Sequence, residues 1–151
     1  MNQRYNALVD FRAKSDFQAG DYSRLLAAIA PRAIAAVTTG TAAVFNRSQE
    51  LVPVDTRKLK SIDTVNLKSS GSQSVAWEGD MVTGTVEYSA DHAAYNEFGT
   101  GRRGAASGNA APGITYNENW PGMSGSPYIR PALDESKPAI KAAFLDNGFT
   151  L

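Results

Sequence analysis

The longest periodic pattern in this sequence runs from Pro31 to about Leu51. Small and aliphatic side chains recur there every three or four residues: Ile34, Val37, Thr41, Val44, Ser48 and Leu51. Residues with this spacing share one face of an α-helix, and that face must be buried against another element. Proline suits the first turn of a helix but not its interior, so we expect a short helix ending near Ala30 and a longer one from Pro31 to Leu51.

A β-hairpin pattern supplies a partner for that helix. Ser74–Glu78 and Met81–Tyr88 flank Gly79-Asp80, a pair suited to a tight turn. In the second strand Val82, Val86 and Tyr88 alternate with Thr83, Thr85 and Glu87, which is typical of a strand with one buried face. A weaker alternation predicts a short strand over Ala7–Ala13.

The second half of the chain predicts two more helices separated by a loop. His92–Phe98 has the pattern of a short helix, and a last helix follows Pro127–Pro131 and stops near Gly148. Its expected apolar face consists of Ala132, Leu133, Ile140, Ala143 and Phe144. Gly99–Gly125 is rich in Gly, Asn, Ser and Ala, so we expect a long, flexible, projecting loop.

These elements predict a single α+β domain over residues 1–151. In it, a small and mostly antiparallel sheet is packed by the long helix and the C-terminal helix. The 42% hydrophobic and 20% charged fractions are typical of a globular chain.

Composition excludes several classes of protein. Fifteen basic and fifteen acidic residues balance, which argues against a dedicated nucleic-acid binder with a broad basic surface. The absence of cysteine excludes disulfide, zinc-thiolate and iron–sulfur sites. No apolar run approaches the roughly 20 residues of a membrane span, and the N-terminus lacks a signal-peptide pattern. We therefore expect synthesis in the cytoplasm and no membrane partner.

One motif suggests a nucleotide site. Gly99–Gly104 satisfies G-x-G-x-x-G, which binds a pyrophosphate only between a strand and a helix. Here it follows an expected helix and opens into an expected loop, so we predict a flexible segment and no cofactor.

No catalytic constellation emerges from the sequence. His92 is the only histidine, and Ser124 lacks the G-x-S-x-G spacing of a nucleophile elbow. The carboxylates show no paired spacing that would nominate a general acid and base: Asp55, Asp63, Asp80, Glu87 and Glu97. We therefore expect no enzyme and no metal site.

Three blocks, in order along the chain, carry a resemblance to a known family. They are Val52-Pro53-Val54-Asp55-Thr56 with Leu59, then Ala93–Thr100 (Ala-Ala-Tyr-Asn-Glu-Phe-Gly-Thr), and finally Ser126–Leu133 (Ser-Pro-Tyr-Ile-Arg-Pro-Ala-Leu). This set resembles the tail-completion, or head–tail joining, proteins of long-tailed bacteriophages. The chain departs from the family pattern at Arg57, where glycine is usual, at His92, where tyrosine is usual, and at Tyr128, where phenylalanine is usual.

The resemblance implies a structural virion protein of the neck or tail, made in the host cytoplasm. Such a protein assembles as a sixfold or twelvefold ring between the portal-side connector and the tail tube, and it carries out no catalysis. A ring subunit contacts two identical neighbours through a head-to-tail interface. Alternatives within the virion are a tail terminator or a head-side stopper ring. More distant alternatives are a nucleotide-binding enzyme using Gly99–Gly104 and a small regulatory DNA-binding protein.

We expect contacts with subunits or partners from two groups of residues. Tyr95, Glu97, Phe98 and Gly99 would lie at a subunit contact or fix the base of the long loop; alternatively, Tyr95 and Phe98 are core residues. The second group comprises Arg102, Arg103, Trp120 and Tyr128. The 99–125 segment would be an arm that docks on a neighbouring neck protein or lines the DNA channel with non-specific phosphate contacts.

Overall fold

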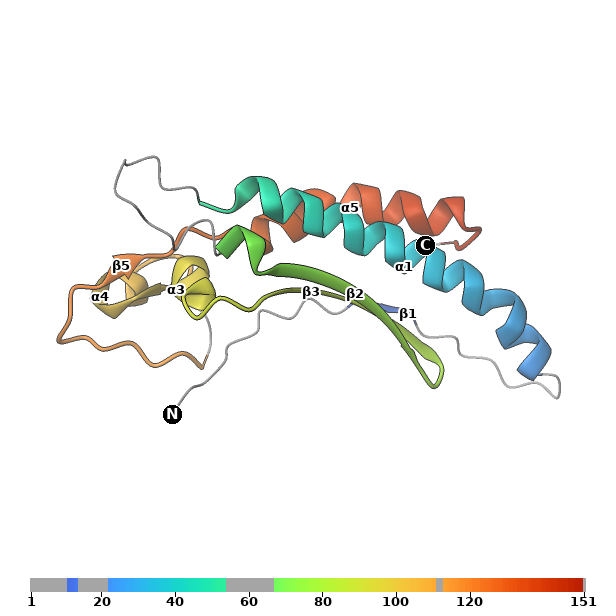
Figure 1. Ribbon diagram of the computed structural model, residues 1–151, viewed down its shortest axis with the longest axis horizontal. Coiled ribbons are helices and arrows are strands. Elements are labelled where there is room, and N and C mark those ends of the chain that lie inside the picture. The colour runs from blue at the N-terminus through green and yellow to red at the C-terminus, as the bar shows by residue number, and fades with distance from the viewer. Residues whose placement is uncertain (1–10, 14–21, 54–66, 111–112, 151) are drawn as a thin grey trace.

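The computed structural model describes residues 11–13, 22–53, 67–110 and 113–150. The elements, in chain order, are β1 (Phe11–Ala13), α1 (Tyr22–Leu51), β2 (Gly71–Glu78), β3 (Met81–Tyr88), α3 (Ala93–Phe98), β4 (Gly99–Thr100), α4 (Gly101–Ala105), β5 (Met123–Ser124) and α5 (Ile129–Asp146). The molecule is elongated: α1 and α5 lie side by side over a sheet, and a smaller unit containing α3, α4 and β5 forms one end (Figure 1). This arrangement confirms the predicted α+β class.

Helix α1 is continuous through Pro31, so the predicted break at this residue is wrong. Pro31 and the preceding Ala27 and Ala28 are exposed, so the hydrogen bond that proline cannot donate is lost on an exposed part of the helix. Ala33 and Val37, beyond the proline, are buried in a cluster with Val82 of β3. Packing of this face keeps α1 helical through Pro31, a residue at which local sequence patterns predict a helix boundary.

The larger sheet has the strand order β1–β3–β2, with both neighbours antiparallel to β3. The hairpin turn at Gly79-Asp80 is confirmed, and Gly79 has a φ of 63°. The alternation in β3 is also confirmed, because Val82, Val86 and Tyr88 are buried. Of the strand predicted at Ala7–Ala13, residues 11–13 form β1, and residues 7–10 lie outside the described residues.

Gly84 of β3 lets α1 lie close to the sheet. A Cβ atom at this position would collide with Oγ1 of Thr41 and would lie 3.0 Å from Cγ1 of Val37. The Thr41 hydroxyl is buried and donates to the backbone oxygen of Val37 at 2.7 Å. A polar residue in the predicted helix stripe is therefore accommodated without an unpaired group.

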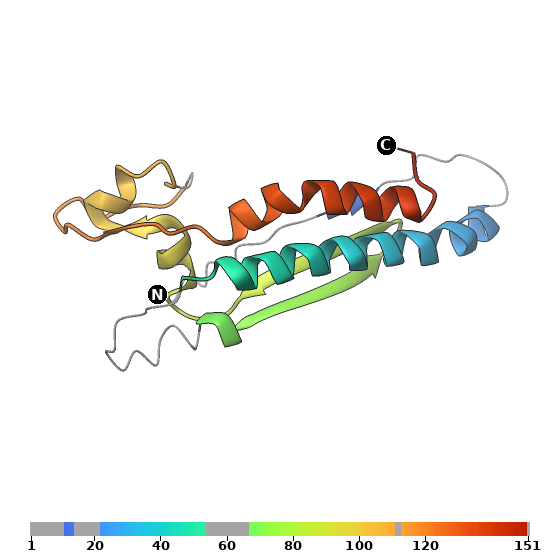
Figure 2. The ribbon, with the colours of Figure 1, turned by 90° about the horizontal axis from the view of Figure 1, so that it is seen from above.

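Helices α1 and α5 run antiparallel to one another, as Figure 2 shows from above. Their contact is close where Gly40 meets Ile140, since a Cβ at Gly40 would lie 3.4 Å from Cγ1 of that side chain. In α5, Ala132 and Ala143 of the predicted apolar face are buried, and the other three members are half-buried: Leu133, Ile140 and Phe144. The C-terminal stop is confirmed at Gly148, which has a φ of 78°.

The segment Ala27–Leu51 is long and apolar enough to cross a membrane by length and composition, contrary to the expectation from sequence. Thr38, Thr39 and Gly40 interrupt the apolar run without lowering its mean hydropathy below that of a span. In the structure its small-residue face is covered by β3 and α5. The core helix of a folded domain and a membrane span share this composition, and only the packing separates them.

Candidate functional site

The 99–125 segment, predicted from its composition to be a loop, has regular elements at both ends. It begins with β4 and α4 and returns through β5, which pairs with β4 in antiparallel register, Gly99 opposite Ser124 and Thr100 opposite Met123. The backbone N–H of Met123 also donates to Oγ1 of Thr100 at 3.2 Å. The described part of the segment is therefore folded back on its own start.

Glycines in this segment permit close backbone packing. A Cβ at Gly99 would lie 2.5 Å from the backbone N of Gly125, and one at Gly104 would lie 2.7 Å from the carbonyl carbon of Gly99. A Cβ at Gly122 would collide with the backbone oxygen of Thr100. A high glycine content by itself predicts a flexible segment. Here Gly99, Gly104 and Gly122 instead lie where two backbones approach too closely for any side chain.

The G-x-G-x-x-G motif directly follows α3, as expected, and its residues form β4 and nearly all of the five-residue α4. The expectation of an irregular segment from Gly99 onward is therefore wrong for this one turn, but only Ala105 of α4 lies behind the motif. The first amides of α4 are already bonded: Arg102 N–H donates to the Trp120 oxygen and Arg103 N–H to the Pro121 oxygen, both at 3.0 Å. These carbonyls occupy the position where a pyrophosphate would accept hydrogen bonds. The local geometry therefore leaves neither of these two amides free for a nucleotide.

Glu97 caps the start of helix α5. Its carboxylate, 1% exposed, accepts the backbone N–H groups of Tyr128 at 2.8 Å, Ile129 at 3.0 Å and Arg130 at 3.2 Å. The first amides of a helix have no partner within the helix, and the helix dipole favours a negative charge at this end. An acid more than thirty residues away in the chain thus takes the part usually played by a neighbouring cap residue.

Arg130 neutralises this carboxylate and joins three segments. Its Nε lies 3.1 Å from Oε1 of Glu97, and its Nη2 donates to the backbone oxygen of Asn109 at 2.9 Å. The guanidinium also lies 5.1 Å from the centre of the Phe98 ring, within cation–π range. The spacing of Arg130 from Glu97 carries no local signal, so the sequence analysis did not pair the two residues.

Three of the predicted contact residues are buried within the chain. Glu97 and Tyr128 are 1% and 0% exposed, and Gly99 is buried between backbones. The prediction that these three residues form a subunit contact is therefore wrong, because they are buried in contacts within the chain itself. The other role considered for Glu97 and Gly99, fixing the base of the 99–125 segment, matches this geometry.

Tyr128 lies at the centre of the larger core cluster. Its ring packs edge-on against Tyr88, with 4.9 Å between ring centres, and its hydroxyl donates to the backbone oxygen of Ala93 at 3.4 Å. Burial, and after it the charge of Glu97, raises the pKa of the Tyr128 phenol above its usual value. Burial likewise raises the pKa of Tyr88, whose hydroxyl is 2.7 Å from that of Ser48.

The remaining predicted contact residues lie nearer the surface. Tyr95 is 54% exposed and Trp120 is 52% exposed, so the alternative that Tyr95 is a core residue is wrong. Phe98 is half-buried beneath the Arg130 guanidinium. Arg102 and Arg103 are exposed on α4.

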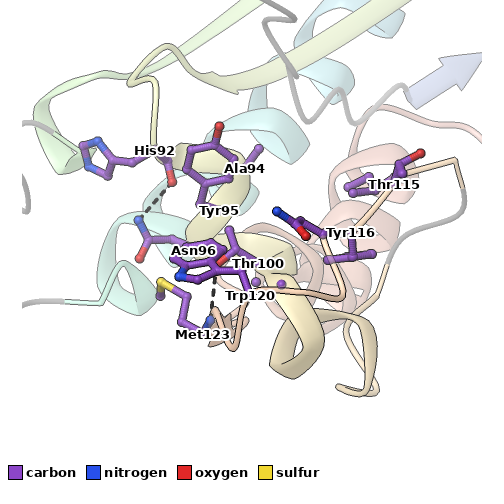
Figure 3. A pocket seen from close by; sticks show the side chains of 13 residues that line it. His92, Ala94, Tyr95, Asn96, Thr100, Thr115, Tyr116, Trp120 and Met123 are labelled. Atoms are coloured by element: carbon purple, nitrogen blue, oxygen red, sulfur yellow. Dashed lines mark hydrogen bonds between the residues drawn. The ribbon is translucent and has the colours of Figure 1, made fainter.

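Tyr95 and Trp120 line a pocket of about 460 Å³, together with Met123, Tyr116 and Ile114. Figure 3 shows Tyr95, Trp120 and Met123 around this pocket, with His92 on one side and Thr115 on the other. Nε2 of His92 is buried without a hydrogen-bond partner in the described structure. The sequence analysis placed Tyr116 and Met123 in the loop and missed the pocket, although aromatic residues recur in an otherwise Gly- and Asn-rich segment.

This pocket is suited to holding an apolar or aromatic group. Aromatic rings and a methionine form much of its wall. Within the described ranges, no three His, Cys, Asp or Glu side chains gather in a way that would hold a metal ion. Comparisons of the chain with models of protein families, with curated proteins and with solved structures give no match.

Proposed function

We propose that this chain is a structural subunit of a long-tailed phage neck, forming a ring that completes the tail and joins it to the head. The observation that carries the proposal is where the three blocks of the resemblance meet. Val52 from the first, Ala93 from the second and Tyr128 from the third belong to one buried cluster. The part of the first block at residues 54–56 lies outside the described residues.

The second and third blocks share a single physical task. Glu97 of the second accepts three amides at the start of α5, and Arg130 of the third balances its charge. The missing side chain of Gly99 lets the backbone of Gly125 pack closely against the backbone that follows Glu97. The motif pair therefore has a reason to occur together and in this order, which supports treating the resemblance as more than chance.

The surface also suits assembly. Large apolar side chains remain exposed at several points of the described surface: Trp77, Tyr95, Trp120, Met123 and Leu145. Exposed aromatic residues are enriched at protein interfaces. The partners in this proposal are identical subunits, the portal-side connector and the tail tube, and the location is the virion. Where α4 faces the channel, the exposed Arg102 and Arg103 would make the non-specific contact with DNA.

The test is the mass of the purified protein over a concentration series, alone and with purified portal-side connector or with tails, together with negative-stain images of each sample. We expect closed sixfold or twelvefold rings, at the latest when a docking partner is present. Rings bound only to tails would favour a tail terminator, and rings bound only to the connector a head-side stopper. A monomer that binds neither partner at any concentration would refute the proposal.

A further inference from the structure

Two exposed apolar features occupy opposite ends of the molecule. One is the hairpin tip, Trp77–Asp80, and the other is the aromatic pocket, formed by Tyr95, Tyr116, Trp120, Met123 and their neighbours. In Figure 1 the tip of β2 and β3 curves away from the helices at one end, and α3, α4 and β5 form the other. A single chain cannot bring its own tip to its own pocket in this fold.

The hairpin tip has the properties of an interface anchor. Trp77 is 48% exposed, although its neighbour across the hairpin, Val82, is buried. The indole N–H donates to the backbone oxygen of Gly79 at 2.8 Å, which ties the ring to its own turn. A ring held in place before binding loses little conformational entropy on docking, and tryptophan is among the residues most enriched at energetic centres of interfaces.

The aromatic pocket has room for such an anchor. Its volume of about 460 Å³ lies within the ~300–1,000 Å³ of pockets that accept small ligands, which is ample for one indole ring. Tyr95, Trp120 and Met123 are each between 43% and 54% exposed, so the pocket opens to the surface. Aromatic and thioether groups are favourable neighbours for an inserted ring.

Charges beside the two features are complementary. Glu78 and Asp80 flank the tip turn and are exposed. Arg102 and Arg103 lie beside the pocket, because their backbone amides bond to the oxygens of Trp120 and Pro121. Both residues are exposed. Two acidic residues, Asp91 and Glu118, are sequence neighbours of residues that line the pocket. The positive charge is therefore confined to the side of the pocket next to α4, where the two arginines lie.

We propose that the hairpin tip of one subunit docks in the aromatic pocket of a second copy of this chain, with Trp77 inserted and Glu78 against Arg102 and Arg103. Such a contact joins two different surfaces, so it is heterologous and repeats from subunit to subunit until a ring closes. This inference rests on the proposed function and specifies its subunit interface.

The chain contains no cysteine, so only introduced cysteines can react in a cross-linking experiment. The test variant is Asp80→Cys with Thr115→Cys, one thiol at the tip and one at an exposed position lining the pocket. Treatment with a short bismaleimide linker is expected to give a ladder of trimers and larger species that ends at the closed ring. Each single-cysteine variant can give dimers at most. The matched control is Asp80→Cys with Ala142→Cys, at an exposed position on α5, and should not form the ladder.

Two further variants connect the ladder to the named side chains. Trp77→Ala in the Asp80→Cys, Thr115→Cys background should reduce the ladder about tenfold or more while the unfolding curve shows a folded protein. In the same background, Glu78→Lys should slow cross-linking about tenfold at low salt, and adding Arg102→Glu should restore it.

The inference is overturned if the test variant forms no species above the dimer at high protein concentration. It is equally overturned if the control ladder matches the test ladder, or if rings seen with the connector show no cross-link between tip and pocket. That last result leaves the proposed neck function standing. A ladder from a protein that never joins connector or tail supports the contact and counts against the neck function instead.

Discussion

At the residue scale, Glu97 shows how one side chain connects distant parts of the chain. Buried at 1% exposure, it replaces the usual local cap of α5 and is balanced by Arg130. The sequence analysis singled out the segment Tyr-Asn-Glu-Phe-Gly-Thr, but it did not predict that its acid caps a helix. A helix cap is normally predicted from the residue just before the helix. A capping residue from a distant segment produces no periodicity or spacing in the sequence from which it could be predicted.

Glu97→Gln should lower the free energy of unfolding by about 1.5–3 kcal/mol, because the amide nitrogen cannot accept the N–H groups that the carboxylate now accepts. Urea unfolding measures this change. Glu118→Gln, at an exposed position, is the matched control and should stay within about 0.5 kcal/mol of the parent. Equal unfolding midpoints for the two variants would show that the cap adds nothing to stability.

Tyr128→Phe should reduce the loss of stability at alkaline pH. Because burial raises the pKa of Tyr128 in the folded chain, the unfolded chain releases the proton first, near pH 10. Stability is therefore complete below about pH 10 and falls above it, by up to about 1.4 kcal/mol per pH unit for each such tyrosine. Tyr88, whose pKa is also raised, retains its share in the variant.

Chemical unfolding at a series of alkaline pH values measures this slope for both proteins. At neutral pH the variant should lie within about 1 kcal/mol of the parent, because the lost hydroxyl makes only a 3.4 Å hydrogen bond. Parallel stability curves above pH 10 would contradict the assignment.

At the scale of elements, the pairing of β4 with β5 joins the two ends of the 99–125 segment. Gly122 has a φ of 58°, and a Cβ there would also collide with the oxygen of Thr100. Gly113 has a φ of 83° but nothing within 4 Å of its Cβ position, and Gly108 is unrestricted in both respects. The chain thus offers a graded series of glycine-to-alanine substitutions.

Gly122→Ala should be the most harmful of the three, because it adds an overpacking cost of about 1–3 kcal/mol to backbone strain of about 1–2 kcal/mol. Gly113→Ala should show the strain alone, and Gly108→Ala should be neutral or slightly stabilising. Hydrogen exchange at the Met123 amide and thermal unfolding measure the series. If Gly122→Ala and Gly113→Ala behaved alike, close backbone packing would not be what Gly122 provides.

At the scale of the whole molecule, the environment of α1 decides what its apolar composition means. Residues Ala27–Leu51 could span a bilayer by length and composition, yet Val37 and Val44 are buried against the sheet and α5. We expect the full chain not to float with vesicles of neutral or anionic lipid. A peptide of residues 27–51 lacks the tertiary partners and should float. Flotation of the folded chain to the same extent would contradict the packing role of α1.

Much of the fold could be predicted because its signals are local. The alternation of Val82, Val86 and Tyr88, the turn at Gly79 and the helical spacing of Val37, Thr41 and Val44 each depend on residues a few positions apart. Periodicity of this kind reports which face will be buried, whatever covers it. The β3 strand bounds, the turn and the end of α5 followed from such signals.

Only the tertiary structure decided the features that depend on distant partners. Helix α1 passes through Pro31 because packing of Ala33 and Val37, just beyond the proline, outweighs one lost hydrogen bond. Gly99, Gly101 and Gly122 are needed because backbones some twenty residues away lie against them, and Glu97 is buried because α5 brings it unpaired amides. Local sequence specifies which conformations a segment prefers, whereas the free energy of contacts across the fold selects which of them is kept.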